Sequence, residues 1–270
     1  MRMKKLCVAM LALSLAGPVW AADPVQNPLI DGESWAALKY DVLGDAEPGD
    51  GRALFEVEAP YRAHDAATVP VVIRQIDEAT KITKAFVIID ENPAPVAAEL
   101  HFGPSMGVLD LELRVRVNQY SNVRVIAETP EGLAMNGRFV KASGGCSAPA
   151  TRDPELALAS MGQMKLKSFA PAALISTPRQ EAQIMIRHPN YSGLQRDQIT
   201  QLFITAHFIN ELEIFQGEDL LFSLTGGISI SENPVFRFKY DDNGADSLRV
   251  RATDTEGNVF ERVLPKGSAT

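Results

Sequence analysis

The chain reads Leu109-Asp-Leu-Glu-Leu-Arg-Val-Arg-Val117 near its middle. Every second side chain of this stretch is apolar, and the side chains between them are charged. Successive side chains of a β-strand point to opposite faces, so this period of two predicts a strand with one buried and one solvated face. The segment 235–240 repeats the pattern, with aromatic residues alternating with basic ones.

Other short apolar runs are bounded by Pro, Asn and Gly residues, which favour turns. They predict further strands over residues 69–73, 85–89, 97–102, 123–127, 181–187, 202–209, 219–224, 247–252 and 258–263. Residues 34–43 carry apolar side chains at helical spacing and predict a short helix, and Asp242-Asn243-Gly244 predicts a hairpin turn. Short strands with no long helices between them predict an all-β protein with two Ig-like antiparallel β-sandwich domains.

The first 22 residues have the layout of a secretory signal peptide. Three basic residues precede an apolar run over 6–16, and a small-residue site ends at Ala21. The apolar run is too short to span a bilayer as a helix. We therefore expect export, with cleavage after Ala21 or Ala22 and removal of Cys7.

The composition is that of a globular protein, with 270 residues, 46% hydrophobic and 22% charged. Signal cleavage removes three of the 26 Lys and Arg residues and leaves 23 against 34 acidic residues, a formal charge of −11. An acidic exported chain is a poor candidate for binding the phosphates of a nucleic acid. No second apolar stretch is long enough for a transmembrane helix, so we expect no membrane span in the mature protein.

Cys146 is the cysteine that remains after export. Exported cysteines are usually oxidised in pairs, so an odd one indicates either intermolecular pairing or a reactive group. Gly144, Gly145 and Ser147 surround it with small residues, which predicts a flexible arm. Six residues from Val140 could extend this arm by roughly 20 Å. We expect an exposed thiol that enters a narrow pocket of another protein; the alternative is a flexible linker with an incidental cysteine.

The predicted organisation has four parts. Residues 1–22 are the signal peptide, and 23–141 form the first sandwich with its short N-terminal helix. Residues 142–170 form the Gly/Ala/Pro-rich linker that carries the cysteine, and 171–270 form the second sandwich.

Motifs in both halves resemble a known pair of proteins. In the first half these are Ala59-Pro-Tyr-Arg-Ala-His-Asp-Ala-Ala-Thr-Val-Pro-Val71 and Gly144-Gly145-Cys146, which resemble SoxY, a subunit of the bacterial sulfur-oxidation carrier. In the second half, Ile186-Arg-His-Pro-Asn-Tyr-Ser-Gly193 and Ile230-Ser-Glu-Asn-Pro-Val235 resemble its partner SoxZ. In that family the two proteins are separate. The chain is most similar to a fused branch, the SoxYZ-like carrier associated with quinoprotein dehydrogenases.

This resemblance implies a function. Cys146 would hold a small sulfur-containing cargo such as thiosulfate covalently in the periplasm. It would present the cargo to redox enzymes of the Sox type or of a quinoprotein dehydrogenase system. The protein would be a carrier without a catalytic constellation, a metal or another cofactor of its own. In SoxY the cysteine lies near a free C-terminus, whereas here Ser147-Ala148-Pro149 and a second domain follow it, and a tethered loop reaches less far than a free tail.

Two other functions use the same thiol. One is an interaction module for a periplasmic oxidoreductase, acting through an intermolecular disulfide or copper delivery. Met161 and Met164 are soft ligands that suit copper, although methionines at that spacing usually fill core gaps. The other is a thiol enzyme, which needs a base near Cys146, and no neighbouring residue supplies one.

We expect structural roles for the remaining polar residues. His207 lies in the apolar segment 202–209 and is expected in the core or at an interface, and His188-Pro189 is expected to shape the domain interface. Ser192, Asp197 and His188 do not form a hydrolase motif, because no Gly-x-Ser-x-Gly sequence is present.

Overall fold

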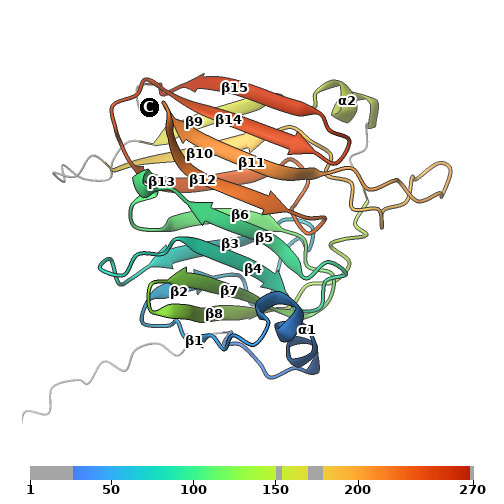
Figure 1. Cartoon of the computed structure of the whole chain (residues 1–270). Coiled ribbons are helices and arrows are strands. Elements are labelled where there is room, and N and C mark those ends of the chain that lie inside the picture. The colour runs from blue at the N-terminus through green and yellow to red at the C-terminus, as the bar shows by residue number, and fades with distance from the viewer. Residues whose placement is uncertain (1–26, 150–153, 170–178, 268–270) are drawn as a thin grey trace, which may run out of the picture.

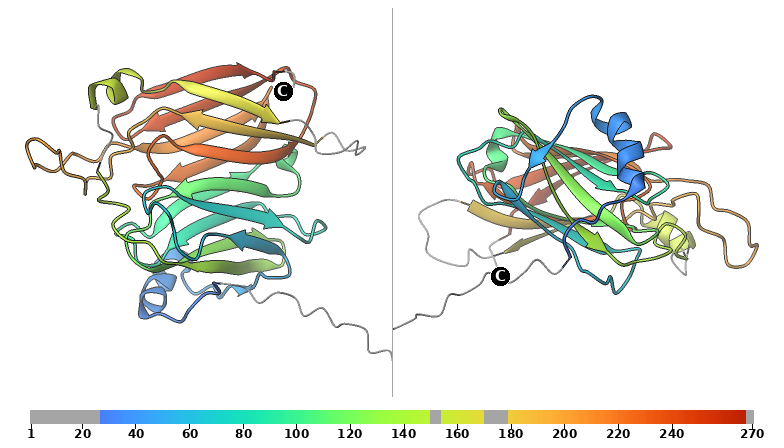
Figure 2. Two further views of the ribbon diagram at one scale, coloured as in Figure 1. Left: turned by 180° about the vertical axis from the view of Figure 1, so that it is seen from behind. Right: turned by 90° about the horizontal axis from the view of Figure 1, so that it is seen from below.

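The computed structural model describes residues 27–149, 154–169 and 179–267, so the predicted signal peptide lies outside the described residues. Within these residues, fifteen strands form two sheets that pack face to face (Figures 1 and 2). The all-β sandwich prediction is confirmed. None of the described helices is long and apolar enough to cross a membrane.

The first half of the chain contains α1 and the first eight strands. Their bounds are α1 (Glu33–Leu43), β1 (Gly49–Asp50), β2 (Phe55–Glu58), β3 (Val69–Gln75), β4 (Lys84–Ile89), β5 (Val96–Phe102), β6 (Asp110–Val115), β7 (Ser121–Thr129) and β8 (Gly132–Val140), with a short 3-10 helix, η1 (Pro104–Met106).

The second half contains α2 and seven strands. Their bounds are α2 (Pro154–Ala159), β9 (Met164–Phe169), β10 (Arg179–Ile186), β11 (Ile209–Gln216), β12 (Asp219–Gly226), β13 (Val235–Asp241), β14 (Ser247–Asp254) and β15 (Val259–Pro265).

Each sheet runs without interruption through both halves of the chain. In the nine-stranded sheet the order is β1-β8-β7-β4-β5-β12-β11-β14-β15, and in the six-stranded sheet it is β2-β3-β6-β13-β10-β9. The halves meet where β5 pairs with β12 and where β6 pairs with β13. The two sandwiches are thus fused edge to edge, which the prediction of a linker between them did not include.

The alternating stretch quoted from the sequence forms this joint in the smaller sheet. Leu113 of β6 lies opposite Val71 of β3 on one side and Phe236 of β13 on the other. All the odd-numbered side chains from Leu109 to Val117 are buried. The core is therefore one cluster with members from both halves, and it includes a T-shaped contact of Phe222 with Phe238 across the two sheets, with ring centroids 5.1 Å apart.

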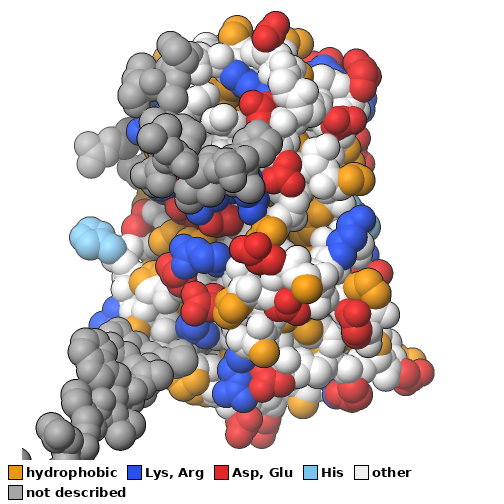
Figure 3. Space-filling model, turned by 90° about the vertical axis from the view of Figure 1, so that its left-hand side faces the viewer, with side chains coloured by type: hydrophobic (Ala, Val, Ile, Leu, Met, Phe, Trp, Pro, Cys, Tyr) orange, Lys and Arg blue, Asp and Glu red, His pale blue; other side chains and the backbone are white. Residues whose placement is uncertain are grey.

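Charged side chains cover the joint from outside. Lys239 of β13 pairs with Asp110 of β6 at 2.5 Å, next to the pairs Arg74 with Glu58 and Arg237 with Glu181. One side of the molecule shows acidic and basic side chains intermixed rather than separated by sign (Figure 3).

Two predictions made from the sequence of the second half are wrong. Residues 202–208 are not a strand; they belong to the long connection between β10 and β11 that projects from the sandwich (Figure 1), and the strand begins only at Ile209. Asp242-Asn243-Gly244 does not close a hairpin, because β13 and β14 belong to different sheets. The predicted linker also contains an ordered strand, β9, which pairs with β10.

Candidate functional site

Cys146 lies in the loop that follows β8, where the two halves meet. Its side chain is fully buried, with an exposure of 0%. The predicted exposed thiol is therefore wrong for this conformation. The reason is that the backbone of the loop finds hydrogen-bond partners in the first half: the Gly144 N–H donates to the Asn118 carbonyl at 2.8 Å, and the Gly145 N–H donates to the Val117 carbonyl at 3.0 Å.

The glycines of the loop permit close approach rather than free movement. A Cβ atom at Gly145 would lie 2.1 Å from the Ala66 carbonyl oxygen, which is a severe clash. Gly144 has a φ of +76°, in the region that favours glycine, and the Ser147 N–H donates back to its carbonyl at 3.2 Å. In this structure Gly144, Gly145 and Ser147 form a folded turn instead of the predicted flexible arm.

The second half of the chain holds the same loop from the other side. The Ser192 hydroxyl donates to the Cys146 carbonyl at 2.5 Å, and the Gln195 side-chain amide donates to the Ala148 carbonyl at 3.0 Å. Ser192 and Gln195 are both buried and follow β10. The cysteine loop is therefore closed by contacts from both halves.

Arg116, directly after β6, is the charged group at this site. It is 1% exposed, and its guanidinium donates to the Gly145 and Ile230 carbonyls at 3.3 Å each and to the Asn190 carbonyl at 3.1 Å. These carbonyls come from three separate segments of the chain. Arg116 thus ties the cysteine loop to both halves of the sandwich.

The closed loop disfavours the reactive form of the thiol. Burial raises the pKa of Cys146 from 9.0 to about 11, against the opposing effect of the Arg116 charge. The thiolate is the nucleophilic form of cysteine, and at neutral pH the closed site holds the neutral thiol. Chemistry at Cys146 therefore requires that the loop open or that a partner change its surroundings.

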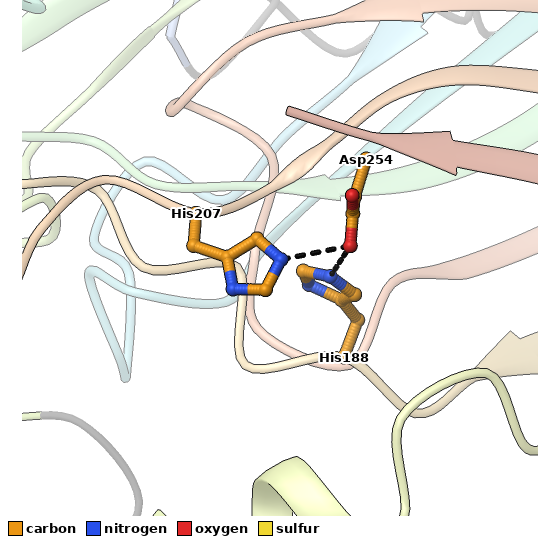
Figure 4. Close-up of side chains that lie close together, drawn as sticks. All are labelled: His188, His207 and Asp254. Atoms are coloured by element: carbon orange, nitrogen blue, oxygen red, sulfur yellow. Dashed lines mark hydrogen bonds and ion pairs between the residues drawn. The ribbon is translucent and has the colours of Figure 1, made fainter. Parts of the chain in front are cut away.

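Sequence reasoning missed a second buried cluster, formed by His188, His207 and Asp254 (Figure 4). His207 Nε2 lies 2.7 Å from Asp254 Oδ2, and His188 Nε2 lies 3.4 Å from the same oxygen. The two imidazole rings meet edge to face, with centroids 4.9 Å apart. The only sequence signal was that His207 stands in an otherwise apolar segment, and the large separations of the three residues along the chain hid the contact.

This cluster has the spacing of metal ligands, but its hydrogen bonds fit a structural role better. His188 Nδ1 accepts a hydrogen bond from the Asn190 N–H at 3.0 Å, so the neutral ring carries its proton on Nε2. A metal ligand would need a free lone pair on that nitrogen. Asp254 also accepts the N–H groups of Glu256 at 3.0 Å and of Asn258 at 2.9 Å. The cluster anchors the β10–β11 connection to the end of β14.

The other candidate residues from the sequence do not form a catalytic site together with the Cys146 thiol. Met164 packs against the core from β9. Asp197 accepts hydrogen bonds from the N–H groups of Ile199 at 3.1 Å and of Thr200 at 2.7 Å, within its own turn. Of the hydrolase candidates, Ser192 alone reaches the cysteine loop, where its hydroxyl binds a carbonyl.

Comparison with known proteins connects this arrangement to two families. The model of the sulfur oxidation protein SoxY matches residues 39–146, and the model of the sulphur oxidation protein SoxZ matches residues 176–265. A search of curated proteins finds no match. A solved structure of the sulfur carrier protein SoxY from Chlorobium limicola f thiosulfatophilum is 22% identical, covers 40% of this chain and 94% of its own, and has a TM-score of 0.34.

The two family matches are in tandem and together cover most of the described chain. The SoxY match ends at Cys146 itself, and the SoxZ match covers the segment that holds the cysteine loop from the second half. The chain therefore belongs to the SoxY and SoxZ families and is a fused SoxYZ-like carrier.

Proposed function

We propose that this protein is a periplasmic carrier that holds a small sulfur-containing intermediate covalently on Cys146 and presents it to partner redox enzymes. The observation that carries the proposal is the SoxY match, which ends at Cys146, the only cysteine among the described residues. The partners are enzymes of the Sox type or of a quinoprotein dehydrogenase system. The signal-peptide layout of residues 1–22 supports export to the periplasm.

The carrier works in two conformations. In the closed one, seen here, the thiol is buried and neutral, which protects it from adventitious disulfides and over-oxidation in an oxidising compartment. In the open one, the loop leaves Ser192 and Gln195, and the thiol enters the partner. With thiosulfate as cargo, a bond forms between the Cys146 sulfur and the terminal sulfur of thiosulfate. The thiol proton goes to solvent, and two electrons pass to the redox cofactor of the partner enzyme.

The intact mass of the protein isolated from the periplasm tests this function. We expect an added mass on the peptide that contains Cys146, which disappears after treatment with a thiol reductant. Cys146→Ala, which places no new polar group in the buried site, should lack the added mass while melting at a similar temperature. The proposal fails if Cys146 never carries a reducible or enzyme-transferable group under conditions in which the cell oxidises sulfur compounds.

A further inference from the structure

Two arginines are buried in the part of the chain that the structure describes, and only one of them has an ion-pair partner there. Arg124 forms an ion pair with Asp90, with Nε and Nη2 contacts of 2.9 to 3.0 Å. Arg116 binds only the carbonyls of Gly145, Asn190 and Ile230. In the described part of the chain, no carboxylate oxygen lies within 4.0 Å of a guanidinium nitrogen of Arg116, the distance limit of an ion pair.

An unpaired buried cation is costly. Buried charges are normally paired, because removing an ion from water costs several kcal/mol that a counter-charge must offset. The carbonyl contacts of Arg116, at 3.1 to 3.3 Å, are longer than the roughly 2.7–2.9 Å of charge-assisted hydrogen bonds to an anion. The guanidinium therefore keeps a positive charge inside the joint that no direct ion pair among the described residues offsets.

The cysteine is the ionisable group best placed to use that charge. One guanidinium nitrogen binds the carbonyl of Gly145, the residue that precedes Cys146. When Cys146 is ionised, its charge acts on Arg116 more strongly than the charges of Glu232 and Asp65 do. Ser231, next to the bound Ile230 carbonyl, has a buried hydroxyl without a hydrogen-bond partner among the described residues. Arg116 is thus a buried cation in direct contact with the residue that precedes Cys146.

We propose that Arg116 is the counter-charge of the carrier site and stabilises negative charge on, or covalently attached to, the Cys146 sulfur. This proposal rests on the proposed carrier function and extends it to a residue beyond the loop. When Cys146 carries an anionic group, the guanidinium exchanges weak carbonyl contacts for an ion pair. Arg116 then favours retention of anionic cargo over neutral or cationic groups of similar size. In this role the guanidinium contacts the attached anionic group directly and takes no part in forming or breaking its bond to sulfur.

Two artificial adducts of opposite charge test the proposal. The exported protein is treated with methanethiosulfonate reagents that carry either an ethylsulfonate or an ethyl-trimethylammonium group. The Cys146 sulfur forms a disulfide with the ethyl sulfur, methanesulfinate leaves, and the thiol proton passes to solvent. Intact mass confirms one adduct per chain. We expect the sulfonate adduct to melt at least about 3 °C above the trimethylammonium adduct, on the scale at which modest free-energy changes move the Tm of a domain of this size.

Variants of Arg116 separate charge from packing. In Arg116→Gln the difference in Tm between the two adducts should vanish, whereas Arg116→Lys should keep most of it because the charge is retained. Arg114→Gln is the matched control, since Arg114 lies in β6 two residues before Arg116 and is exposed, and it should leave the difference unchanged. Equal melting temperatures of the two adducts in the unmutated protein would overturn the proposal even if Arg116→Gln fails to fold.

The outcome is independent of the test of the carrier function. The adduct experiment uses purified protein and small reagents, so it can succeed when no natural cargo is found on Cys146. Conversely, Cys146 could carry a natural adduct while the two artificial adducts melt at the same temperature. That result would support the carrier function and show that Arg116 has no electrostatic role in it. A loss of stability in Arg116→Gln that is equal for both adducts would show that Arg116 only ties the loop to the sandwich.

Discussion

Cys146 is buried in the structure, although its neighbours in the sequence predict that it is exposed. Small residues around it predict mobility and exposure. The folded chain uses the same small residues to bring the loop close to the Ala66 and Val117 carbonyls, where no larger residue fits. Burial of the thiol then follows from contacts made by Arg116 and Ser192, which lie far away in sequence.

The reactivity of this thiol should report whether the loop is closed. A pKa of about 11 instead of 9.0 leaves roughly 100-fold less thiolate at pH 7. We expect slow alkylation of the native protein by iodoacetamide, with a rate that keeps rising with pH beyond 9. Ser192→Ala removes the hydrogen bond to the Cys146 carbonyl and should increase the rate at pH 7 about fivefold, which corresponds to about 1 kcal/mol. Ser160→Ala, which alters a bond near α2, is the control; equal rates in all three proteins would contradict the closed loop.

A methyl group at Gly145 should open the same loop. In Gly145→Ala the new Cβ would lie 2.1 Å from the Ala66 carbonyl oxygen and 2.7 Å from the Val117 carbonyl oxygen, so the backbone must move. We expect faster alkylation of Cys146 and a loss of about 1–3 kcal/mol in the free energy of unfolding, measured by urea denaturation. Gly49→Ala, whose Cβ would be at an ordinary 3.7 Å from its nearest neighbour, should be close to neutral. A Gly145→Ala protein with unchanged stability and reactivity would rule out this tight contact.

The β10–β11 connection is the part of the structure that sequence patterns described least well. Its apolar residues predicted a strand over 202–209, but Ile199, Leu202 and Phe203 are exposed, at 92%, 69% and 60%. A periodicity argument assumes that apolar residues face a core, and a loop that projects from the sandwich has none to face. The loop is ordered instead by polar groups, above all by the cluster at Asp254.

That cluster should make the stability of the protein sensitive to mild acid. Burial lowers the pKa of His188, so the unfolded chain takes up a proton below its ordinary pKa of 6.5 while the folded chain does not. Stability from this group is complete above pH 6.5 and falls as the pH drops below it, by up to about 1.4 kcal/mol per pH unit. Urea unfolding at pH 7.5, 6.5, 5.5 and 4.5 measures the slope. His188→Gln should flatten it, whereas His64→Gln, at an exposed position, should not.

A second loss is expected at lower pH. Burial raises the pKa of Asp254, but hydrogen bonds from Asn258 and His207 outweigh it and lower the pKa to about 2. The carboxylate therefore contributes stability above pH 3.8, which is lost as the pH falls toward 2. A stability profile that is flat between pH 7.5 and 4.5 would contradict the neutral state of His188 in the folded protein.

The continuous sheets make the two halves depend on each other. Separated, the first half would expose the edges of β5 and β6, and the second half those of β12 and β13. Unpaired edges with apolar faces promote aggregation. We therefore expect the fold to behave as one cooperative body, although the chain consists of two family domains.

Unfolding of the intact chain should therefore be a single transition. Trp35, the one Trp outside residues 1–22, reports on the first half, and far-ultraviolet circular dichroism reports on all strands. We expect both signals to change at the same urea concentration. Residues 23–153 and 154–270, expressed separately, should aggregate or melt at lower temperature and regain stability when combined. A fragment 23–153 that is monomeric and as stable as the whole protein would contradict the shared core.

The local pattern of residues determined most of the strands, the α1 helix and the all-β class, because alternation and residue type are properties of neighbours in the chain. It also singled out Cys146 as the carrier residue, which stays a prediction. Tertiary contacts decided the rest. The fusion of the sandwiches depends on which strand edges meet. The alternating pattern around Leu113 would be the same in an isolated domain, so it does not reveal the pairing with the second half. The closed loop, the buried charge of Arg116 and the meeting of His188 with Asp254 each join segments dozens of residues apart. Burial and electrostatics at those contacts depend on three-dimensional packing, which periodicity does not encode.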